Sequence, residues 1–298
     1  MAQRRLVYLF LSSILFGLSN AAATLTSTGC ADPAGMQKCL NDNAASLTAC
    51  INKANGDQQI ILGCGCGQYI DNYNCYASFC WNRVYECEYQ EYMTEYFNQC
   101  DIAKFPVPYF PAPNNSPDSC SCNLGNVLVG MLSSFNQLAT CSNNELNLAD
   151  ASQGVQAQAA CQCCSLSGAI SSLYSFCPTT NPSLIGLAQV NTFQSQLGES
   201  FSTCSPSLTQ FNCAANLGFS AQAVGGTFLR PDNLPVTGTA TLTNLPGKVT
   251  APASGTVFTY TNNAVNLIYT ISAANAPGGG GGSINALMLL NKLFLFII

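Results

Sequence analysis

The pattern of apolar and polar residues along the chain begins with a mainly apolar run at residues 6–18. Two arginines precede it, and the small residues of "SNAAA" follow. A basic start, an apolar stretch and small residues are the layout of a secretory signal. Thirteen residues are too few for a retained span, which needs about 20. We therefore predict that residues 1–23 are a signal peptide, cleaved after Ala21 or Ala23.

A second apolar run, residues 284–298, ends at the last residue and follows a Gly/Ser spacer. This order is the signal for a glycosylphosphatidylinositol (GPI) anchor. Lys292 would be costly at the centre of a bilayer, which argues against the alternative of a transmembrane tail. We predict that residues 277–298 are the anchor spacer and a removed tail, with Asn275 or Gly278 as the attachment residue.

Between these ends, several stretches have helical periodicity. The clearest is "WNRVYECEYQEYMTEYFNQC", where tyrosines recur on one face of a helix. They are Tyr85, Tyr89, Tyr92 and Tyr96, and Glu88, Glu91 and Glu95 form an adjacent stripe. One interpretation is a sugar platform beside paired carboxylates. The other, which the single-helix spacing favours, is tyrosines in a core and glutamates in water. "NLGNVLVGMLSSFNQLATC" and "LSGAISSLYSFC" also predict short apolar helices.

All cysteines lie between these terminal segments. They are Cys30, Cys39, Cys50, Cys64, Cys66, Cys75, Cys80, Cys87, Cys100, Cys120, Cys122, Cys141, Cys161, Cys163, Cys164, Cys177, Cys204 and Cys213. An even number in a secreted chain predicts a disulfide framework. Zinc binding or a redox centre is disfavoured, because zinc sites use Cys-x2-Cys pairs and reduced thiolates. No metal site is expected.

The cysteine spacing indicates an internal duplication. Three cysteines of the first half, Cys64, Cys66 and Cys80, recur 97 residues later as Cys161, Cys163 and Cys177. We predict a first cysteine-rich helical module over residues 24–100 and a second over residues 120–213. Each holds nine cysteines, so complete oxidation requires at least one bridge between them.

The segment between the modules, residues 101–119, contains five prolines and predicts an extended, exposed linker. It carries an N-glycosylation acceptor, Asn114-Asn115-Ser116, which requires surface exposure.

Residues 214–276 are rich in threonine, serine and glycine, and cysteine is absent after Cys213. Runs such as "GTATLTNL" and "NLIYTIS" alternate like strands. The composition equally suits an O-glycosylated stalk. We expect a stalk that contains short β-strands.

Charge and composition narrow the functional classes. Without the two terminal signals the chain carries 6 basic and 14 acidic side chains, a net charge of −8. An acidic surface repels phosphate backbones, so nucleic acid is not an expected partner. The chain has no histidine, the commonest general base, and no nucleophile or phosphate-loop motif. We therefore do not expect an enzyme.

One family resemblance rests on the first module. Its cysteines read Cys39-x10-Cys50-x13-Cys64-x-Cys66-x8-Cys75-x4-Cys80-x19-Cys100. This spacing is similar to that of the fungal CFEM domain, an eight-cysteine helical module of secreted and anchored proteins, with Cys30 as the eighth cysteine. The resemblance covers residues 30–100, with a wider first spacing and an additional Cys87. It implies lipid anchoring and, as in some members, haem held by an aspartate before the central Cys-x-Cys.

Asp57 is the position that would match this haem ligand. The alternative is a solvated turn in "NKANGDQQ".

The expected function is that of a non-enzymatic, GPI-anchored, disulfide-rich protein of a fungal cell surface or wall, without a cofactor. Its expected partners are the membrane, wall polysaccharide or other surface proteins. The alternatives are a haem or small-ligand carrier and a surface enzyme acting on polysaccharide. The expected fold is mainly α.

Overall fold

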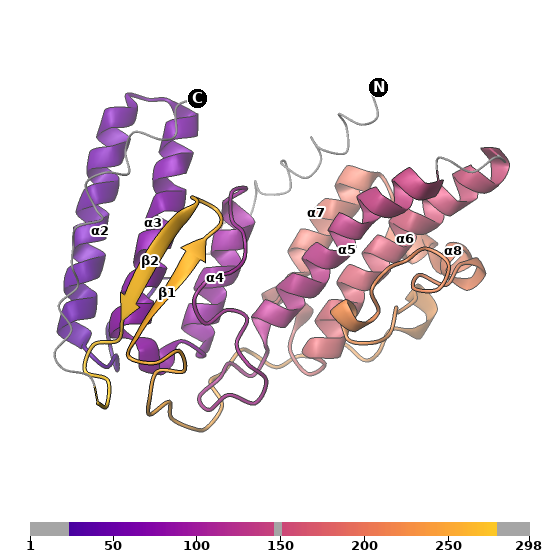
Figure 1. Ribbon diagram of the computed structural model, residues 1–298. Coiled ribbons are helices and arrows are strands. Elements are labelled where there is room, and N and C mark those ends of the chain that lie inside the picture. The colour runs from indigo at the N-terminus through magenta and orange to yellow at the C-terminus, as the bar shows by residue number, and fades with distance from the viewer. Residues whose placement is uncertain (1–23, 146–150, 279–298) are drawn as a thin grey trace. The chain divides into compact units, whose positions relative to one another are not determined.

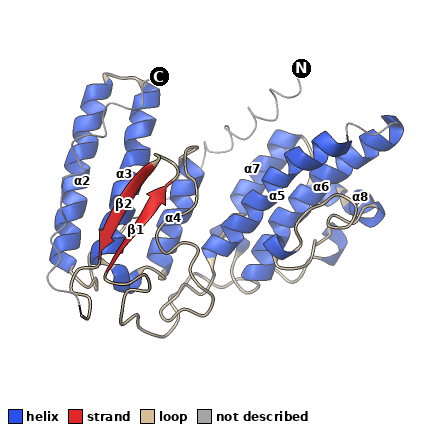
Figure 2. Ribbon diagram, viewed as in Figure 1, coloured by secondary structure: helices blue, strands red, loops and turns tan. Residues whose placement is uncertain are grey.

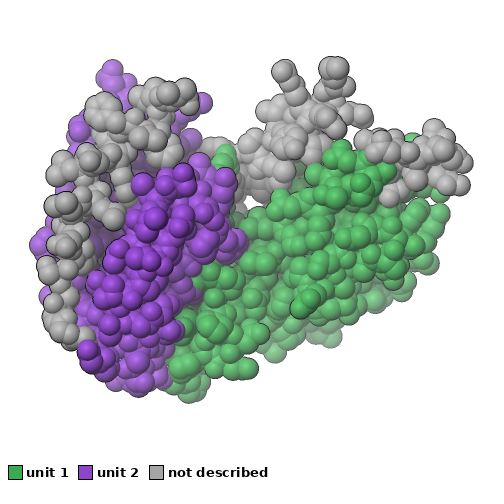
Figure 3. All heavy atoms as spheres, in the orientation of Figure 1, with its two compact units in different colours: residues 1–24, 85–101, 110–247 green, residues 25–84, 102–109, 248–298 purple. Residues whose placement is uncertain are grey.

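The computed structural model describes residues 24–145 and 151–278. These residues form two compact units, shown in two colours in Figure 3. Unit 1 comprises residues 85–101 and 110–247, and unit 2 comprises residues 25–84, 102–109 and 248–278. Helices dominate, and the sheet found in the described residues has two strands (Figure 2). The predicted mainly α, disulfide-rich fold is confirmed. The predicted signal peptide and apolar tail lie outside the described residues.

Unit 2 is built on a helical hairpin of α2 (Pro33–Ala54) and α3 (Gln58–Phe79), which lie side by side in Figure 1. Asp32 caps α2 by accepting a hydrogen bond from the amide of Gly35. The turn between the helices consists of Asn55 and Gly56, both with positive φ (50° and 86°). Asparagine and glycine are the residues that adopt this conformation at least cost, so the "NG" pair ends α2 and reverses the chain.

The second layer of unit 2 is an antiparallel β-hairpin of β1 (Val257–Asn262) and β2 (Leu267–Ser272). Alternation decides which face is buried, because Tyr269 and Ile271 are buried while Ile268 is exposed. The hairpin is fastened to α3, since Asn262 donates to the hydroxyl of Tyr73. After β2, the carbonyl of Ala274 accepts a hydrogen bond from the indole of buried Trp81 (2.8 Å).

The threonine-rich segment therefore differs from the expected stalk. Its first part, to residue 247, belongs to unit 1 and the rest, to residue 276, belongs to unit 2. "NLIYTIS" contains β2, as predicted. The prediction of a strand in "GTATLTNL" is wrong: that run makes only isolated bridges, at Ala240 with Thr180 and at Asn244 with Cys120. It runs beside loops, which offer no continuous ladder of backbone partners.

Unit 1 is built on the antiparallel pair α5 (Leu124–Glu145) and α6 (Ala151–Phe176), seen side by side in Figure 1. Small residues let these helices approach closely. A Cβ added to Gly130 would lie 2.3 Å from the Ser172 hydroxyl, and one added to Gly168 would lie 2.3 Å from the Ser134 hydroxyl. The contact is reciprocal, so a side chain added at either glycine would require the facing serine, or the helix that carries it, to shift.

Shorter helices complete unit 1. They are α4 (Cys87–Gln99), α7 (Leu187–Leu197), α8 (Ser205–Gln210) and the 3-10 turns Pro182–Leu184, Phe201–Thr203, Gln222–Val224 and Pro231–Asn233. A buried cluster of four cysteines with Ala160, Leu217 and Phe219 packs one end of the α5–α6 pair. In unit 2, Trp81–Arg83 forms a 3-10 turn after α3.

No cysteine is free in the part of the chain that is described. The pairs are Cys30–Cys80, Cys39–Cys75, Cys50–Cys64, Cys87–Cys120, Cys122–Cys177, Cys141–Cys161, Cys163–Cys204 and Cys164–Cys213. Cys66 and Cys100 are oxidised as well. Nine cysteines in each predicted module required at least one disulfide between the modules. Cys87–Cys120 is such a disulfide, because Cys87 lies in the first predicted module and Cys120 in the second.

The disulfides also support the duplication. In each helical hairpin, one bond joins the residues just outside its two ends: Cys30–Cys80 in unit 2 and Cys122–Cys177 in unit 1. A second bond joins the helices near their turn: Cys50–Cys64 in unit 2 and Cys141–Cys161 in unit 1. Cys64 and Cys80 therefore occupy positions equivalent to those of Cys161 and Cys177.

The proline-rich residues 101–119 are less exposed than the sequence predicts. Val107, Phe110 and Ala112 are buried, because apolar side chains alternate with the prolines and find partners in the units. Phe110, for example, stacks on Phe97 of α4 with ring centroids 5.9 Å apart. Asn114 remains exposed.

Candidate functional site

Asp57, the residue that matches a CFEM haem ligand, is the N-cap of α3 in the structure. Its Oδ1 accepts hydrogen bonds from the backbone amides of Gln59 (2.9 Å) and Ile60 (3.2 Å). The residue is exposed at the turn between α2 and α3. Capping accounts for an aspartate at this position, because it satisfies amides that the first helical turn leaves without partners.

The tyrosine stripe lies in the core of unit 1. Tyr89, Tyr92 and Tyr96 of α4 are buried. Burial raises the pKa of Tyr96 above its ordinary value of 10.0. Glu91 is exposed; desolvation raises its pKa, and the Glu88 carboxylate raises it further. This arrangement agrees with the core interpretation of the stripe rather than with a sugar platform.

Among the described residues, three side chains of the kinds that bind metals lie within 4.8 Å of one another: Cys163, Cys204 and Glu199. The two cysteines form a disulfide with each other. Disulfide sulfurs are not thiolates, which are the form that binds metals. The Glu199 carboxylate accepts a hydrogen bond from the Thr203 hydroxyl (2.7 Å). The cluster is therefore a disulfide beside a local side-chain hydrogen bond.

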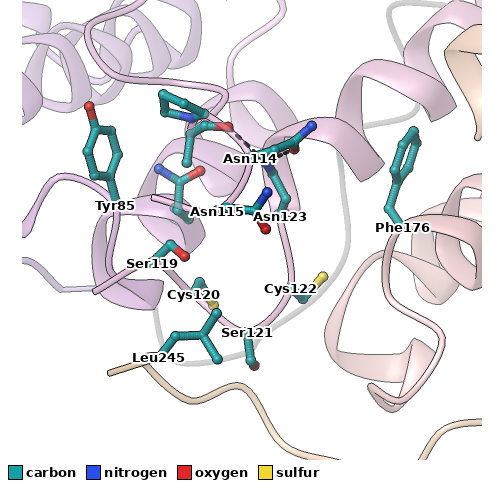
Figure 4. A pocket seen from close by; sticks show the side chains of 13 residues that line it. Tyr85, Asn114, Asn115, Ser119, Cys120, Ser121, Cys122, Asn123, Phe176 and Leu245 are labelled. Atoms are coloured by element: carbon teal, nitrogen blue, oxygen red, sulfur yellow. Dashed lines mark hydrogen bonds between the residues drawn. The ribbon is translucent and has the colours of Figure 1, made fainter. Parts of the chain in front are cut away.

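A pocket of about 380 Å³ lies in unit 1 (Figure 4). Its residues are Tyr85, Gln90, Ala112, Pro113, Asn114, Asn115, Ser119, Cys120, Ser121, Cys122, Asn123, Phe176 and Leu245. Two disulfides hold its floor, since Cys120 is bonded to Cys87 and Cys122 to Cys177. The pocket walls are thus covalently tied to α4 and to the end of α6.

Asn123 connects the pocket to helix α5. Its Oδ1 accepts a hydrogen bond from the amide of Asn126 (3.1 Å), which caps the helix. Its Nδ2 donates to the carbonyl of Ala112 (2.8 Å) and, at 3.4 Å, to Oδ1 of Asn114. Figure 4 shows the contacts of Asn123 with Ala112 and Asn114 as dashed lines. The side chain is therefore fixed by the start of α5.

The lining is polar but carries no charged side chain. It offers three asparagine amides, the hydroxyls of Ser119 and Ser121, and the rings of Tyr85 and Phe176 on opposite sides (Figure 4). Burial raises the pKa of Tyr85, so its phenol stays protonated and neutral. Amides, hydroxyls and aromatic faces suit a neutral, many-hydroxyl ligand such as a sugar, which forms hydrogen bonds and presents apolar C–H faces.

The predicted modification residues lie at three exposed places. Asn114 is at the pocket rim of unit 1. Asn275 and Gly278 lie at the end of the described chain in unit 2, both with positive φ (55° and 81°). The Asn275 Nδ2 donates to the carbonyl of Ala31 (3.1 Å).

Comparison with protein-family models, curated proteins and solved structures found no match. Across residues 24–145 and 151–278, no helix has both the length and the apolar character needed to cross a membrane. The disulfides are those of a cysteine-rich protein folded in an oxidising compartment and fit an extracellular protein.

Sequence reasoning located Asn114 but not the pocket around it. The lining residues come from four separated parts of the chain, near residues 85–90, 112–123, 176 and 245. The signals that could have indicated the site were the acceptor motif itself and the polar cluster "NNSPDSCSCN" beside it.

Proposed function

We propose that this chain is a non-enzymatic, GPI-anchored, disulfide-rich protein of the cell surface or cell wall with a structural or interaction role. The observation that carries the proposal is the state of the cysteines, every one of which is oxidised. Such a chain is suited to an oxidising exterior, and disulfides of this kind stabilise by about 2–4 kcal/mol each. Wall polysaccharide and other surface proteins are the partners we propose.

The place of the last described residues supports the anchor part of the proposal. Ala273, Ala274 and Ala276 are buried in unit 2, and Ala274 is tied to Trp81. Asn275 is tied to Ala31 near the start of the unit. A lipid attached at Asn275 or Gly278 would therefore hold unit 2 directly at the membrane, with no long stalk between them.

Expression of the full chain in a yeast host tests the anchor. We expect the protein on the cell surface, and its release into the medium by phosphatidylinositol-specific phospholipase C. The control is a chain that ends at Gly278, which should be secreted without the enzyme. In Asn275→Gln, anchoring persists if Gly278 is the attachment residue and fails if Asn275 is. Retention of the full chain in membranes freed of cell wall after phospholipase treatment would contradict the proposal and favour a transmembrane tail.

The chain that ends at Gly278 also tests the interaction role. We expect the oxidised protein to sediment with isolated fungal cell walls, and the reduced and alkylated protein to stay in solution, because the binding surfaces depend on the disulfides. If the oxidised protein does not sediment with walls, an interaction role in the wall is refuted while the anchor remains open to its own test.

A further inference from the structure

Two independent features meet at Asn114 in unit 1. It is the first residue of the acceptor motif Asn114-Asn115-Ser116, and its side chain also lines the 380 Å³ pocket. A glycan added at this residue would begin at the pocket rim.

The Asn114 amide is held in one orientation. Its Oδ1 accepts hydrogen bonds from Nδ2 of Asn126 (3.1 Å) and, more weakly, from Nδ2 of Asn123 (3.4 Å). Asn123 is itself fixed by Ala112 and by the start of α5. Both contacts use the oxygen, so the nitrogen is directed away from this pair of amides. N-glycosylation takes place on that nitrogen, and the contacts to the oxygen can persist when the sugar is present.

The pocket has the chemistry to hold the attached sugar. An N-linked glycan begins with N-acetylglucosamine, a neutral ring with hydroxyls and an acetamide group. The pocket offers neutral amides and hydroxyls, together with the rings of Tyr85 and Phe176. Its volume of about 380 Å³ is within the range of small-ligand sites, about 300–1,000 Å³. A charged lining would instead have favoured an ionic ligand.

Tethering decides which sugar occupies the site. The innermost sugar is bonded directly to Asn114 Nδ2, so its binding to the pocket is intramolecular, with an effective concentration on the order of millimolar. A free sugar must reach that concentration in solution to compete. Even a site with millimolar affinity would therefore be occupied mainly by the glycan of its own chain.

We propose that Asn114 carries an N-glycan and that its innermost N-acetylglucosamine is seated in this pocket. In the attachment step, a lipid-pyrophosphate-linked oligosaccharide of the secretory pathway is the donor. The bond between Asn114 Nδ2 and sugar C1 forms, the bond between C1 and the phosphate oxygen breaks, and Nδ2 loses one proton as the lipid pyrophosphate leaves. The seated sugar then covers the floor formed by Cys120 and Cys122, whose bonds lead to α4 and α6.

The test is the rate at which glycosidases act on the native full chain recovered from the surface of a glycosylating yeast host. Peptide N-glycosidase must reach the bond to Asn114, whereas an endoglycosidase cuts between the first two sugars. If about nine-tenths of the molecules hold the sugar in the pocket, peptide N-glycosidase should act about tenfold more slowly, because only the open tenth is accessible. The endoglycosidase should act at its normal rate, and reduction with denaturation should abolish the difference.

An internal control comes from a second acceptor motif in unit 2. Gln58→Asn with Ile60→Thr creates the motif at exposed positions near the start of α3, where the pocket is absent. Peptide N-glycosidase should release this glycan at the ordinary rate from the same native molecule. Asn126→Ala, which removes a donor to Asn114 Oδ1, should accelerate release at Asn114.

Either of two results would overturn the proposal. One is release from native Asn114 as fast as from the control position. The other is the absence of a glycan at Asn114 in the full chain from the glycosylating host, as shown by site-resolved mass spectrometry. Neither result bears on the lipid anchor or on wall binding, which have separate tests.

Discussion

The two equivalent disulfides near the helical turns should have different effects when they are removed. Cys50–Cys64 and Cys141–Cys161 close loops of 14 and 20 residues. In the chain-entropy account, loops of these lengths lower the stability of the unfolded state by nearly equal amounts, about 3 kcal/mol each. The surroundings of the two bonds differ much more than the loop lengths.

The α2–α3 end has little core besides its disulfide. Met36, Asn43 and Ala54 are the buried residues of α2, and most of residues 44–53 are exposed. Most of the stability of a helix in a protein comes from tertiary packing of its apolar face, and this end of the hairpin has little such packing. Without Cys50–Cys64, we therefore expect this end to open locally. In contrast, Cys141 and Cys161 belong to a buried cluster that also contains Leu217 and Phe219.

Amide hydrogen exchange separates these cases in the double variants Cys50→Ala/Cys64→Ala and Cys141→Ala/Cys161→Ala. In the first, a local loss of about 3 kcal/mol corresponds to exchange about 100-fold faster around the α2–α3 turn. Amides near the Trp81 end of α3 should keep their protection. In the second, the cluster should limit local opening, so that the loss appears mainly in global unfolding. Unchanged exchange at the α2–α3 turn in the first variant would refute the reasoning.

Three further predictions concern single residues, and their effects on stability are measured by chemical unfolding. Gly168→Ala places a Cβ 2.3 Å from the Ser134 hydroxyl and should lower the free energy of unfolding by about 1–3 kcal/mol. The control is Gly65→Ala, whose Cβ meets no atom within 4 Å; it should not destabilise the protein and can raise the free energy of unfolding by up to about 1 kcal/mol. Equal losses in the two variants would contradict the close packing of α5 and α6. Asp57→Ala should cost about 1 kcal/mol and Asp57→Ser much less, because serine restores the cap. A ferric-haem titration of the same variants tests the CFEM-type ligand, since saturable Soret binding lost in Asp57→Ser at unchanged stability would identify the carboxylate. Burial raises the pKa of Tyr96, so the stability that the protonated phenol contributes should be complete below pH 10.0 and be lost as pH rises toward the folded-state pKa. Tyr96→Phe should flatten this alkaline decline in the free energy of unfolding. Parallel curves of stability against pH for the two proteins would contradict the prediction.

Local patterns predicted the helical parts of this fold. The tyrosine periodicity anticipated α4 and its buried face, although Tyr85 precedes the helix. The 97-residue recurrence anticipated that Cys80 and Cys177 hold equivalent positions, and both close a helical hairpin from outside its ends. The helix depends on residues near one another in sequence, and the duplication on a repeated spacing, so both can be recognised from the sequence alone.

The remaining features depend on long-range contacts. Strand alternation in "GTATLTNL" did not produce a strand, because Ala240 and Asn244 have only single bridging partners. Disulfide pairing was open because many connectivities fit the same spacing. The pocket combines Tyr85, Asn123 and Leu245, and no local pattern links residues so far apart.

The overlapping disulfides have a consequence for survival among extracellular proteases. The covalent loops Cys30–Cys80 and Cys87–Cys120 each enclose a continuous stretch of backbone. Together, Cys122–Cys177 and Cys164–Cys213 enclose the stretch from residue 122 to 213. One peptide-bond cut inside any of these stretches releases no fragment, since the two new ends stay linked through sulfur. A nicked molecule would stay a single covalent molecule, heavier by the water added at the cut, until its disulfides are reduced.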